Sequence, residues 1–153
     1  MAAYFFDTSA LVKRYATETG TAWVTALLNP AARNHIFIAR ITGAEMISAI
    51  MRKKRGLKIS EADAETAATL FRSDLANRFR IVEITPVIVE SAMTLAESHT
   101  LRGYDAVQLA AALHTEARRR TRGLPALSLI TADDDLLQAG RAEGLMTGNP
   151  NNY

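Results

Sequence analysis

The stretch Tyr4–Val12, which reads YFFDTSALV, decides the fold of this 153-residue chain. Its aromatic residues predict a buried strand that stops at Asp7, after which Thr8 or Ser9 can cap a helix reaching about Tyr15. A strand that is apolar throughout is typical of a parallel sheet with both faces covered. Ligands of such sheets bind beyond the carboxyl ends of the strands, which is where Asp7 would lie.

Strands and helices alternate along the rest of the chain. We expect strands at 35–38, 80–84, 127–131 and 145–147, and helices at about 23–28, 42–55, 61–75, from Pro86, at 105–120 and after 133. Few hairpin signals separate them. The pattern therefore predicts an α/β fold, a mostly parallel sheet with helices on both faces, in one domain spanning 1–153.

Three expectations concern the faces of these helices. The helix at 42–55 is apolar on most sides, so we expect it to be largely buried. Lys13 and Arg14 should point away from the core. The helix that begins at Pro86 should present one apolar face to the core, formed by Val89, Ala92, Met93 and Ala96.

Composition excludes several classes of protein. A hydrophobic fraction of 48% argues against disorder, and no apolar run reaches the roughly 18 residues of a membrane helix. The N-terminus lacks the layout of a secretory signal, so we expect a cytoplasmic protein with no membrane contact. The absence of cysteine excludes disulfides and thiolate-bound metals, which leaves oxygen and imidazole as possible ligands.

Four acids lie where a strand or loop meets a helix, or in the opening turns of a helix: Asp7, Glu45, Asp105 and Asp133. Each aspartate could simply cap its helix. Glu45 is different because its neighbours within one turn are apolar, and an unpaired buried carboxylate costs several kcal/mol. Either an exposed seam or a functional role explains it.

Taken together, the acids predict a metal site. Asp7 and Asp133 follow strands, and parallel strands end at the same edge of a sheet. Carboxylates gathered there repel one another, and a hard cation such as Mg²⁺ or Mn²⁺ resolves the repulsion. Four carboxylates without a nucleophile-base pair favour attack of metal-activated water on a phosphodiester.

Supporting groups and substrate contacts are less sharply defined. Thr131 could orient a bound water or ligand, and Asp135 could act behind Asp133, although a helix often begins with several acids for its dipole alone. The basic groups suggest RNA, since phosphate contacts supply most sequence-independent affinity. Those that we expect to bind RNA are Lys13, Arg14, Arg52 and Arg55. Cations at helix ends are equally explained by the dipole.

The ordered motifs resemble a known family. These are the stretch 7–13 (DTSALVK), Glu45 early in its helix, the stretch 102–110 (RGYDAVQLA) and the stretch 129–133 (LITAD). They resemble the motifs of PIN-domain ribonucleases, most closely the VapC-type toxins of toxin-antitoxin pairs. The similarity spans nearly the whole chain.

The resemblance implies a Rossmann-like three-layer α/β/α sandwich and an Mg²⁺- or Mn²⁺-dependent endoribonuclease. It also implies a homodimer and a cognate VapB-like antitoxin that enters the active-site groove. By motif, Asp7, Glu45, Asp105 and Asp133 are its acidic metal-site residues. The supporting positions are Thr8, Ser9, Thr131 and Asp135. The run of three acids at 133–135 departs from the family pattern, in which the later positions are often basic or neutral.

Two other classes fit parts of the sequence. A noncatalytic RNA- or protein-binding module would keep the fold and use the basic groups alone. A phosphatase of the haloacid dehalogenase type also places an aspartate after its first strand, but it requires a second aspartate two residues later. Ser9 occupies that position.

Overall fold

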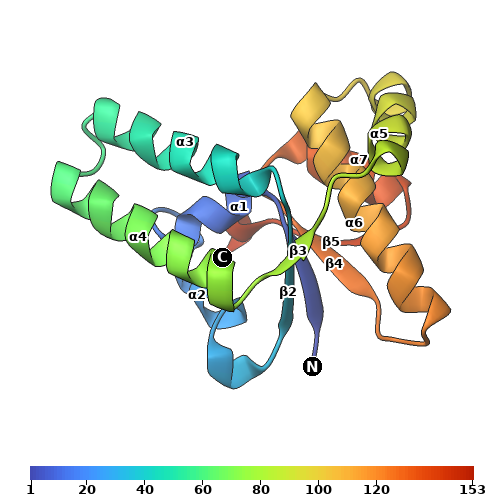
Figure 1. Cartoon of the computed structure of the whole chain (residues 1–153), viewed down its shortest axis with the longest axis horizontal. Coiled ribbons are helices and arrows are strands. Elements are labelled where there is room, and N and C mark those ends of the chain that lie inside the picture. Colours follow the sequence, from blue (N-terminus) through green and yellow to red (C-terminus); the bar gives the residue numbers. More distant parts are fainter.

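The sheet is built around β1 (Ala3–Phe6), which lies at its centre in the computed structural model of residues 1–153 (Figure 1). All five strands are parallel, in the order β3-β2-β1-β4-β5. The others are β2 (His35–Ala39), β3 (Arg80–Val82), β4 (Leu127–Ile130) and β5 (Met146–Gly148). The predicted parallel α/β architecture is confirmed.

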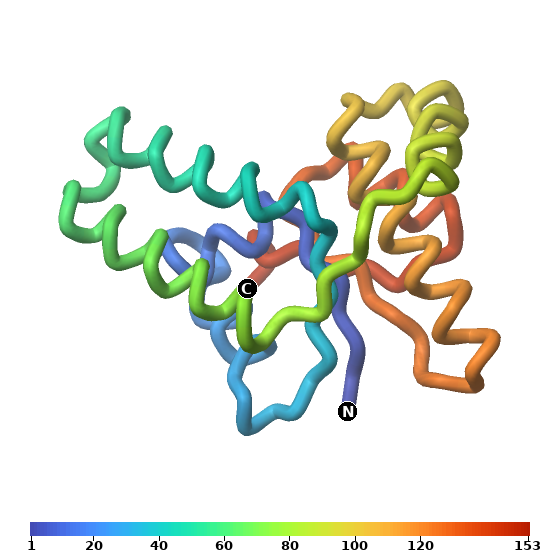
Figure 2. The backbone as a smooth tube through the Cα atoms, viewed as in Figure 1, coloured from blue at the N-terminus to red at the C-terminus, as the bar shows by residue number.

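Helices cover both faces of the sheet and complete three layers (Figures 1 and 2). One face carries α1 (Thr8–Leu11), α2 (Thr21–Leu27), α3 (Thr42–Arg55) and α4 (Glu61–Asn77). The other carries α5 (Pro86–His99), α6 (Gly103–Thr121) and α7 (Asp134–Ala142). The first helix is shorter than expected, because after Leu11 it tightens into a 3-10 turn at Val12–Arg14.

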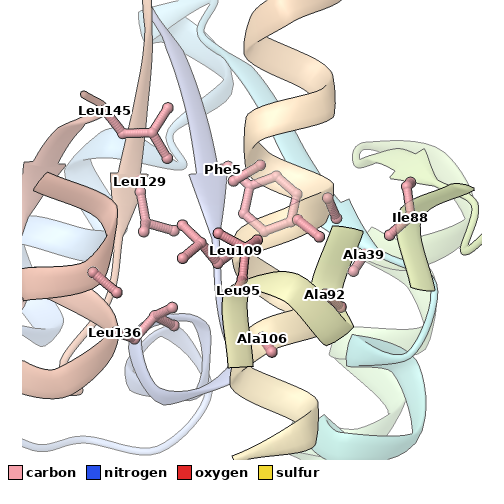
Figure 3. Close-up of a cluster of buried hydrophobic side chains, with 14 of the residues drawn as sticks. Phe5, Ala39, Ile88, Ala92, Leu95, Ala106, Leu109, Leu129, Leu136 and Leu145 are labelled. Atoms are coloured by element: carbon pink, nitrogen blue, oxygen red, sulfur yellow. The ribbon is translucent and has the colours of Figure 1, made fainter. Parts of the chain in front are cut away.

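Alternation along each strand divides the buried side chains between two cores. Phe5 and Leu129 point towards α5, α6 and α7, where they pack with Leu109 (Figure 3). Phe6 and Ile130 point the other way, into the cluster under α1 to α4. Because both faces are covered, the central strand β1 (AYFF) is apolar at every position, and its neighbours β2 and β4 are apolar at all but one, His35 and Ser128.

The connections place a crevice beside β1. The chain moves outward from β1 to β2 and β3, then crosses back through α5 and α6 to pair β4 with the opposite edge of β1. The direction of winding therefore reverses between β1 and β4. In open α/β sheets the crevice at this reversal is where ligands bind, outside the carboxyl ends of the strands.

Two expectations about buried faces are wrong. Helix α3 is not largely buried: only Thr42, Met46 and Ile50 are. Helix α5 buries Ile88, Ala92 and Leu95, whereas Val89 and Met93 remain 43% and 63% exposed. Helix α5 has apolar residues on more than one side, so the sequence is compatible with burial of either face. Packing against α6 buries the face of Ile88 and Leu95 instead of the face of Val89 and Met93. No helix combines the length and apolarity needed to cross a membrane.

The C-terminal segment is fastened to α2. The ring of Tyr153 stacks on the ring of Trp23 with 4.3 Å between centroids. Gly20, which precedes α2, has φ +88°, and a Cβ there would lie 2.8 Å from the carbonyl carbon of Pro150. Glycine is required at this position both for its backbone conformation and for the close approach of the chain end.

Replacing Gly20 by alanine should therefore be costly, and Gly144 supplies a matched control. Gly144 has nearly the same φ, +86°, but a Cβ there meets nothing within 4 Å. We expect Gly144→Ala to lower the free energy of unfolding by about 1–2 kcal/mol, and Gly20→Ala by a further ~1–3 kcal/mol from the clash. Urea unfolding followed by circular dichroism measures both. Equal losses would show that the clash is relieved without cost.

Candidate functional site

Asp7 stands at the carboxyl end of β1 and is 4% exposed. Its Oδ1 accepts a hydrogen bond from the backbone amide of Ala10 at 3.2 Å, so the carboxylate does cap α1. The hydroxyl of Ser9 lies 2.9 and 3.0 Å from its two oxygens. Burial raises the pKa of Asp7 from 3.8 to about 7, against the opposing effect of these hydrogen bonds. The cap is thus also a buried acid poised to lose its proton near neutrality.

A chain of hydroxyls connects Asp7 to the end of β4. The Oγ1 atom of Thr131 accepts from the amide of Asp133 at 3.0 Å and lies 3.3 Å from Ser9 Oγ. Ser9 Oγ in turn accepts from the amide of Ala132 at 2.9 Å. When Ser9 donates its one proton to Asp7, the Thr131 hydroxyl can donate to Ser9, and Thr131 also lowers the pKa of Asp7. Thr131 and Ser9 therefore hold the ends of β1 and β4 together.

Asp133 begins α7 in the same way that Asp7 begins α1. Its Oδ1 accepts from the amide of Leu136 at 2.9 Å. The other oxygen makes no hydrogen bond within the chain and is free for a ligand. Asp134 and Asp135 follow in the first turn and are exposed. Asp133 is the acid of this run that lines the site.

Glu45 is held by a buried amide to which the sequence motifs assigned no role. Gln108 on α6 is 1% exposed, and its Nε2 donates to Glu45 Oε1 at 2.8 Å and to Thr42 Oγ1 at 2.9 Å. The bond joins α3 to α6 across the opening of the crevice. The available signal was an amide on the buried face of α6, three residues after Asp105, where an unpartnered polar group would be costly.

Asp105 lies in the first turn of α6, with the other acids around it. Burial raises its pKa, and the charge of Asp133 raises it further, followed by smaller contributions from Glu45 and Asp135. The guanidinium of Arg102 acts in the opposite direction. The charge of Asp105 also raises the pKa of Asp7. These couplings show that the acids share one electrostatic environment.

All four predicted acids line a single cleft of about 780 Å³. They come from four separate segments: the ends of β1 and β4 and the first turns of α3 and α6. Cations also line the cleft, namely Arg52, Lys53, Lys58 and Arg102. The cleft thus combines acids with cations that suit a phosphate-bearing chain.

Only one of the four cations predicted to bind RNA lines the cleft. Arg52 lines the cleft, but Arg14 and Arg55 do not. The expectation that Lys13 points away from the core is wrong: it is 5% exposed and pairs with Glu18 at 3.4 Å. The 3-10 turn that replaces the end of the first helix rotates Lys13 inward.

The donor set of the cleft fits a hard divalent ion bound partly through water. No three His, Asp or Glu side chains approach closely enough to hold an ion on their own. Mg²⁺ does not require this, because it usually keeps several waters and binds one or two carboxylates. The Oγ1 atom of Thr8 is buried without a partner in the same cleft, where such a water would satisfy it.

The sequence profile of the PIN domain matches residues 4–142. The chain belongs to the PIN-domain family. Two curated relatives of this PIN domain are Ribonuclease VapC45 of Mycobacterium tuberculosis (strain CDC 1551 / Oshkosh) and Ribonuclease VapC49 of Mycobacterium tuberculosis (strain ATCC 25618 / H37Rv). Each is 34% identical over 113 residues, which cover 74% of this chain and 76% of the relative.

Solved structures share the fold of this PIN domain. PAE2754 from Pyrobaculum aerophilum has a TM-score of 0.62 at 20% identity, over 95% of this chain and 83% of the other. VapBC2 from Rickettsia felis, bound to a DNA fragment from its promoter, has a TM-score of 0.61 at 18% identity, over 96% of this chain and 98% of the other. A toxin-antitoxin complex from Klebsiella pneumoniae has a TM-score of 0.58 at 21% identity, over 96% of this chain and 97% of the other.

The raised pKa of Asp7 predicts how the stability of the metal-free PIN domain depends on pH. The folded state binds the Asp7 proton more tightly than the unfolded state, so this contribution to stability is complete below pH 4 and is lost as the pH rises to about 7. Asp7→Asn removes this loss of stability at high pH, because asparagine has no proton to release. In EDTA at pH 8 we expect the variant to be more stable than the natural protein by up to about 4 kcal/mol.

Urea unfolding between pH 4.5 and 8 measures this difference. The advantage of Asp7→Asn should shrink towards the acidic end of the series. Asp134→Asn, at an exposed position in the first turn of α7, is the matched control and should follow the natural protein throughout. Parallel curves for the natural protein and Asp7→Asn would contradict the prediction.

Proposed function

We propose that this PIN domain is an Mg²⁺- or Mn²⁺-dependent endoribonuclease and the toxin of a VapBC-like toxin-antitoxin pair. The observation that carries the proposal is the convergence of Asp7, Glu45, Asp105 and Asp133 on one cleft that cations also line. Similarity to two proteins named as VapC ribonucleases supports RNA as the substrate.

The four acids would hold the ion. Bound there, it would supply a Lewis acid for the phosphodiester and lower the pKa of a coordinated water. Asp7 has one carboxylate face fixed by Ala10 and Ser9, and Glu45 is fixed by Gln108. Such hydrogen bonds hold ligating carboxylates in place, and their loss typically costs 10–100-fold in affinity or activity.

The cations and one aromatic ring would position the RNA. Arg52, Lys58 and Arg102 are exposed at the cleft, where they can contact successive phosphates. Tyr104 is 64% exposed and lines the same cleft, beside Asp105. An accessible ring next to the acids can stack on a base and hold a single strand across them.

A cognate VapB-like antitoxin is the proposed protein partner. The toxin-antitoxin complex from Klebsiella pneumoniae and VapBC2 from Rickettsia felis share this fold over 96% of the chain. A segment of the antitoxin that enters the cleft would cover the acids and displace RNA. Cleavage should therefore stop when the purified cognate antitoxin is added.

Removing one acid tests the nuclease. Asp105→Asn should reduce RNA cleavage by about 100-fold or more in the presence of Mg²⁺ or Mn²⁺, because it deletes a negative charge from the cleft. Cleavage of a labelled single-stranded RNA measures the rate, and EDTA should abolish it. Asp134→Asn is the matched control and should keep full activity.

Metal binding is a separate readout. Mg²⁺ or Mn²⁺ should raise the melting temperature of the natural protein, and by less in Asp7→Asn, since an ion bound only by the folded state stabilises it. Natural rates of cleavage in both Asp7→Asn and Asp105→Asn would refute the catalytic site. RNA binding that depends on the cations alone would then favour a noncatalytic module.

We also propose a homodimer that uses the exposed face of α5. Val89 and Met93 are one helical turn apart and share this face, at 43% and 63% exposure. Both are residues that the sequence pattern assigned to a core. Neighbouring exposed apolar side chains mark a surface for interaction, and we assign this surface to a second copy of the chain.

Charges on this face should separate the subunits. We expect the double variant Val89→Glu/Met93→Glu to elute as a monomer where the natural protein elutes as a dimer, because each interface would bury four unpaired carboxylates. Size-exclusion chromatography with light scattering measures the mass. Leu70→Glu on α4, which also replaces an exposed apolar residue by glutamate, should leave the dimer intact. A natural protein of monomer mass would contradict the proposal.

A further inference from the structure

A second cavity, of about 330 Å³, lies between the last turns of α6 and the edge strand β3. It shares no lining residue with the cleft of the acids. Helix α6 carries both, since Asp105 lies in its first turn and Arg119 fourteen residues later, roughly 21 Å along the axis. The cavity is therefore a separate feature, near the opposite end of the same helix.

Arg119 lines this cavity and is only 7% exposed. Its Nε and Nη2 atoms donate to the carbonyl oxygen of Pro125 at 3.1 and 2.9 Å. That carbonyl is neutral and uses two of the five N–H groups of the guanidinium. A buried cation without a carboxylate costs free energy that an anion would recover.

A second arginine shares the aromatic contact of Arg119. The guanidinium carbons of Arg80 and Arg119 lie 5.9 and 5.7 Å from the centroid of the Phe37 ring. The ring offsets part of the cost of burying charge. It also brings two like charges near each other. Their combined field reaches His35, whose pKa is lowered by burial and then by both arginines.

No carboxylate neutralises this group. Four arginines line the cavity, Arg80, Arg118, Arg119 and Arg122, and none forms an ion pair. One carboxylate, Glu83, also lines the cavity, but it pairs with Arg40, which lies outside the lining. Glu116 lies outside the lining, accepts a hydrogen bond from the amide of Leu127 and faces Arg120.

The dipole of α6 does not account for so many cations. Its C-terminus is equivalent to about half a negative charge. A single cation in the last turns is sufficient to offset it, and the exposed Arg118 supplies one. Offsetting the helix dipole requires neither a buried Arg119 nor the approach of Arg80 from β3. The excess positive charge faces the cavity.

We propose that this cavity is a phosphate-binding site. Guanidinium groups bind phosphate oxygens with paired N–H donors, and phosphate carries enough charge to balance several of them. The phosphate could belong to an RNA strand that runs beyond the cleft or to a free nucleotide. The site itself does not require that the protein cleave RNA.

Thermal unfolding with inorganic phosphate tests the site. In EDTA, phosphate should raise the melting temperature of the natural protein by about 2–4 °C. Arg118→Gln/Arg122→Gln should lose this rise, and both positions are exposed, so the fold should persist. Arg120→Gln/Arg141→Gln also removes two exposed charges, neither of them in the cavity, and is the matched control that should keep it.

RNA binding distinguishes the two sources. If the phosphate belongs to RNA, Arg118→Gln/Arg122→Gln should weaken binding of a short single-stranded RNA in EDTA at least fivefold more than the control pair, and phosphate should compete. If it belongs to a nucleotide, AMP should reproduce the rise in melting temperature, and the two variants should bind RNA equally.

Two results would overturn the proposal. One is an equal rise with phosphate in the natural protein and in Arg118→Gln/Arg122→Gln. The other is stronger stabilisation by an acidic peptide than by phosphate or RNA, which would make the cavity a peptide site. Neither result depends on cleavage, so failure here is distinguishable from failure of the nuclease proposal.

Discussion

Repulsion between carboxylates at the carboxyl ends of β1 and β4 is the constraint on which the site depends. Asp7 is buried, and Asp105 lies among Asp133, Glu45 and Asp135, so burial and like charge both favour the protonated forms. A fold that keeps such a cluster must compensate for it. The hydroxyl of Ser9, the amide of Gln108 and the guanidinium of Arg102 do so in part. A divalent cation would complete the compensation.

The topology explains why the compensation occurs at this place. Reversal of the winding beside β1 leaves a crevice between two strand ends, and the helices that start there point their first turns into it. The same helix, α6, continues to the arginines near β3. One rigid element therefore presents an acid at one end and an unneutralised cationic group at the other.

The sequence was sufficient where one physical rule acted alone. Mostly apolar strands that alternate with helices predicted a parallel sheet, and the shared edge of that sheet brought Asp7 and Asp133 together. The sequence was insufficient where one pattern of apolar residues was compatible with two ways of packing a helix. Helix α5 has apolar residues on more than one side, and only its contact with α6 decides that Ile88 is buried rather than Val89. The inward turn of Lys13 required knowledge of a 3-10 turn that no residue type signals.

The hydrogen bond between Ser9 and Thr131 joins residues 122 positions apart. Contacts of such long sequence separation carry a large entropic cost of loop closure, and both ends must have been synthesised before they can form. Asp105 and Asp133 both lie beyond β3, so a nascent chain that has emerged only as far as β3 carries two of the four acids and has no partner for β1 on the β4 side. The cleft with all four acids is therefore complete only after β4 has joined β1 and the chain that follows β4 has been made.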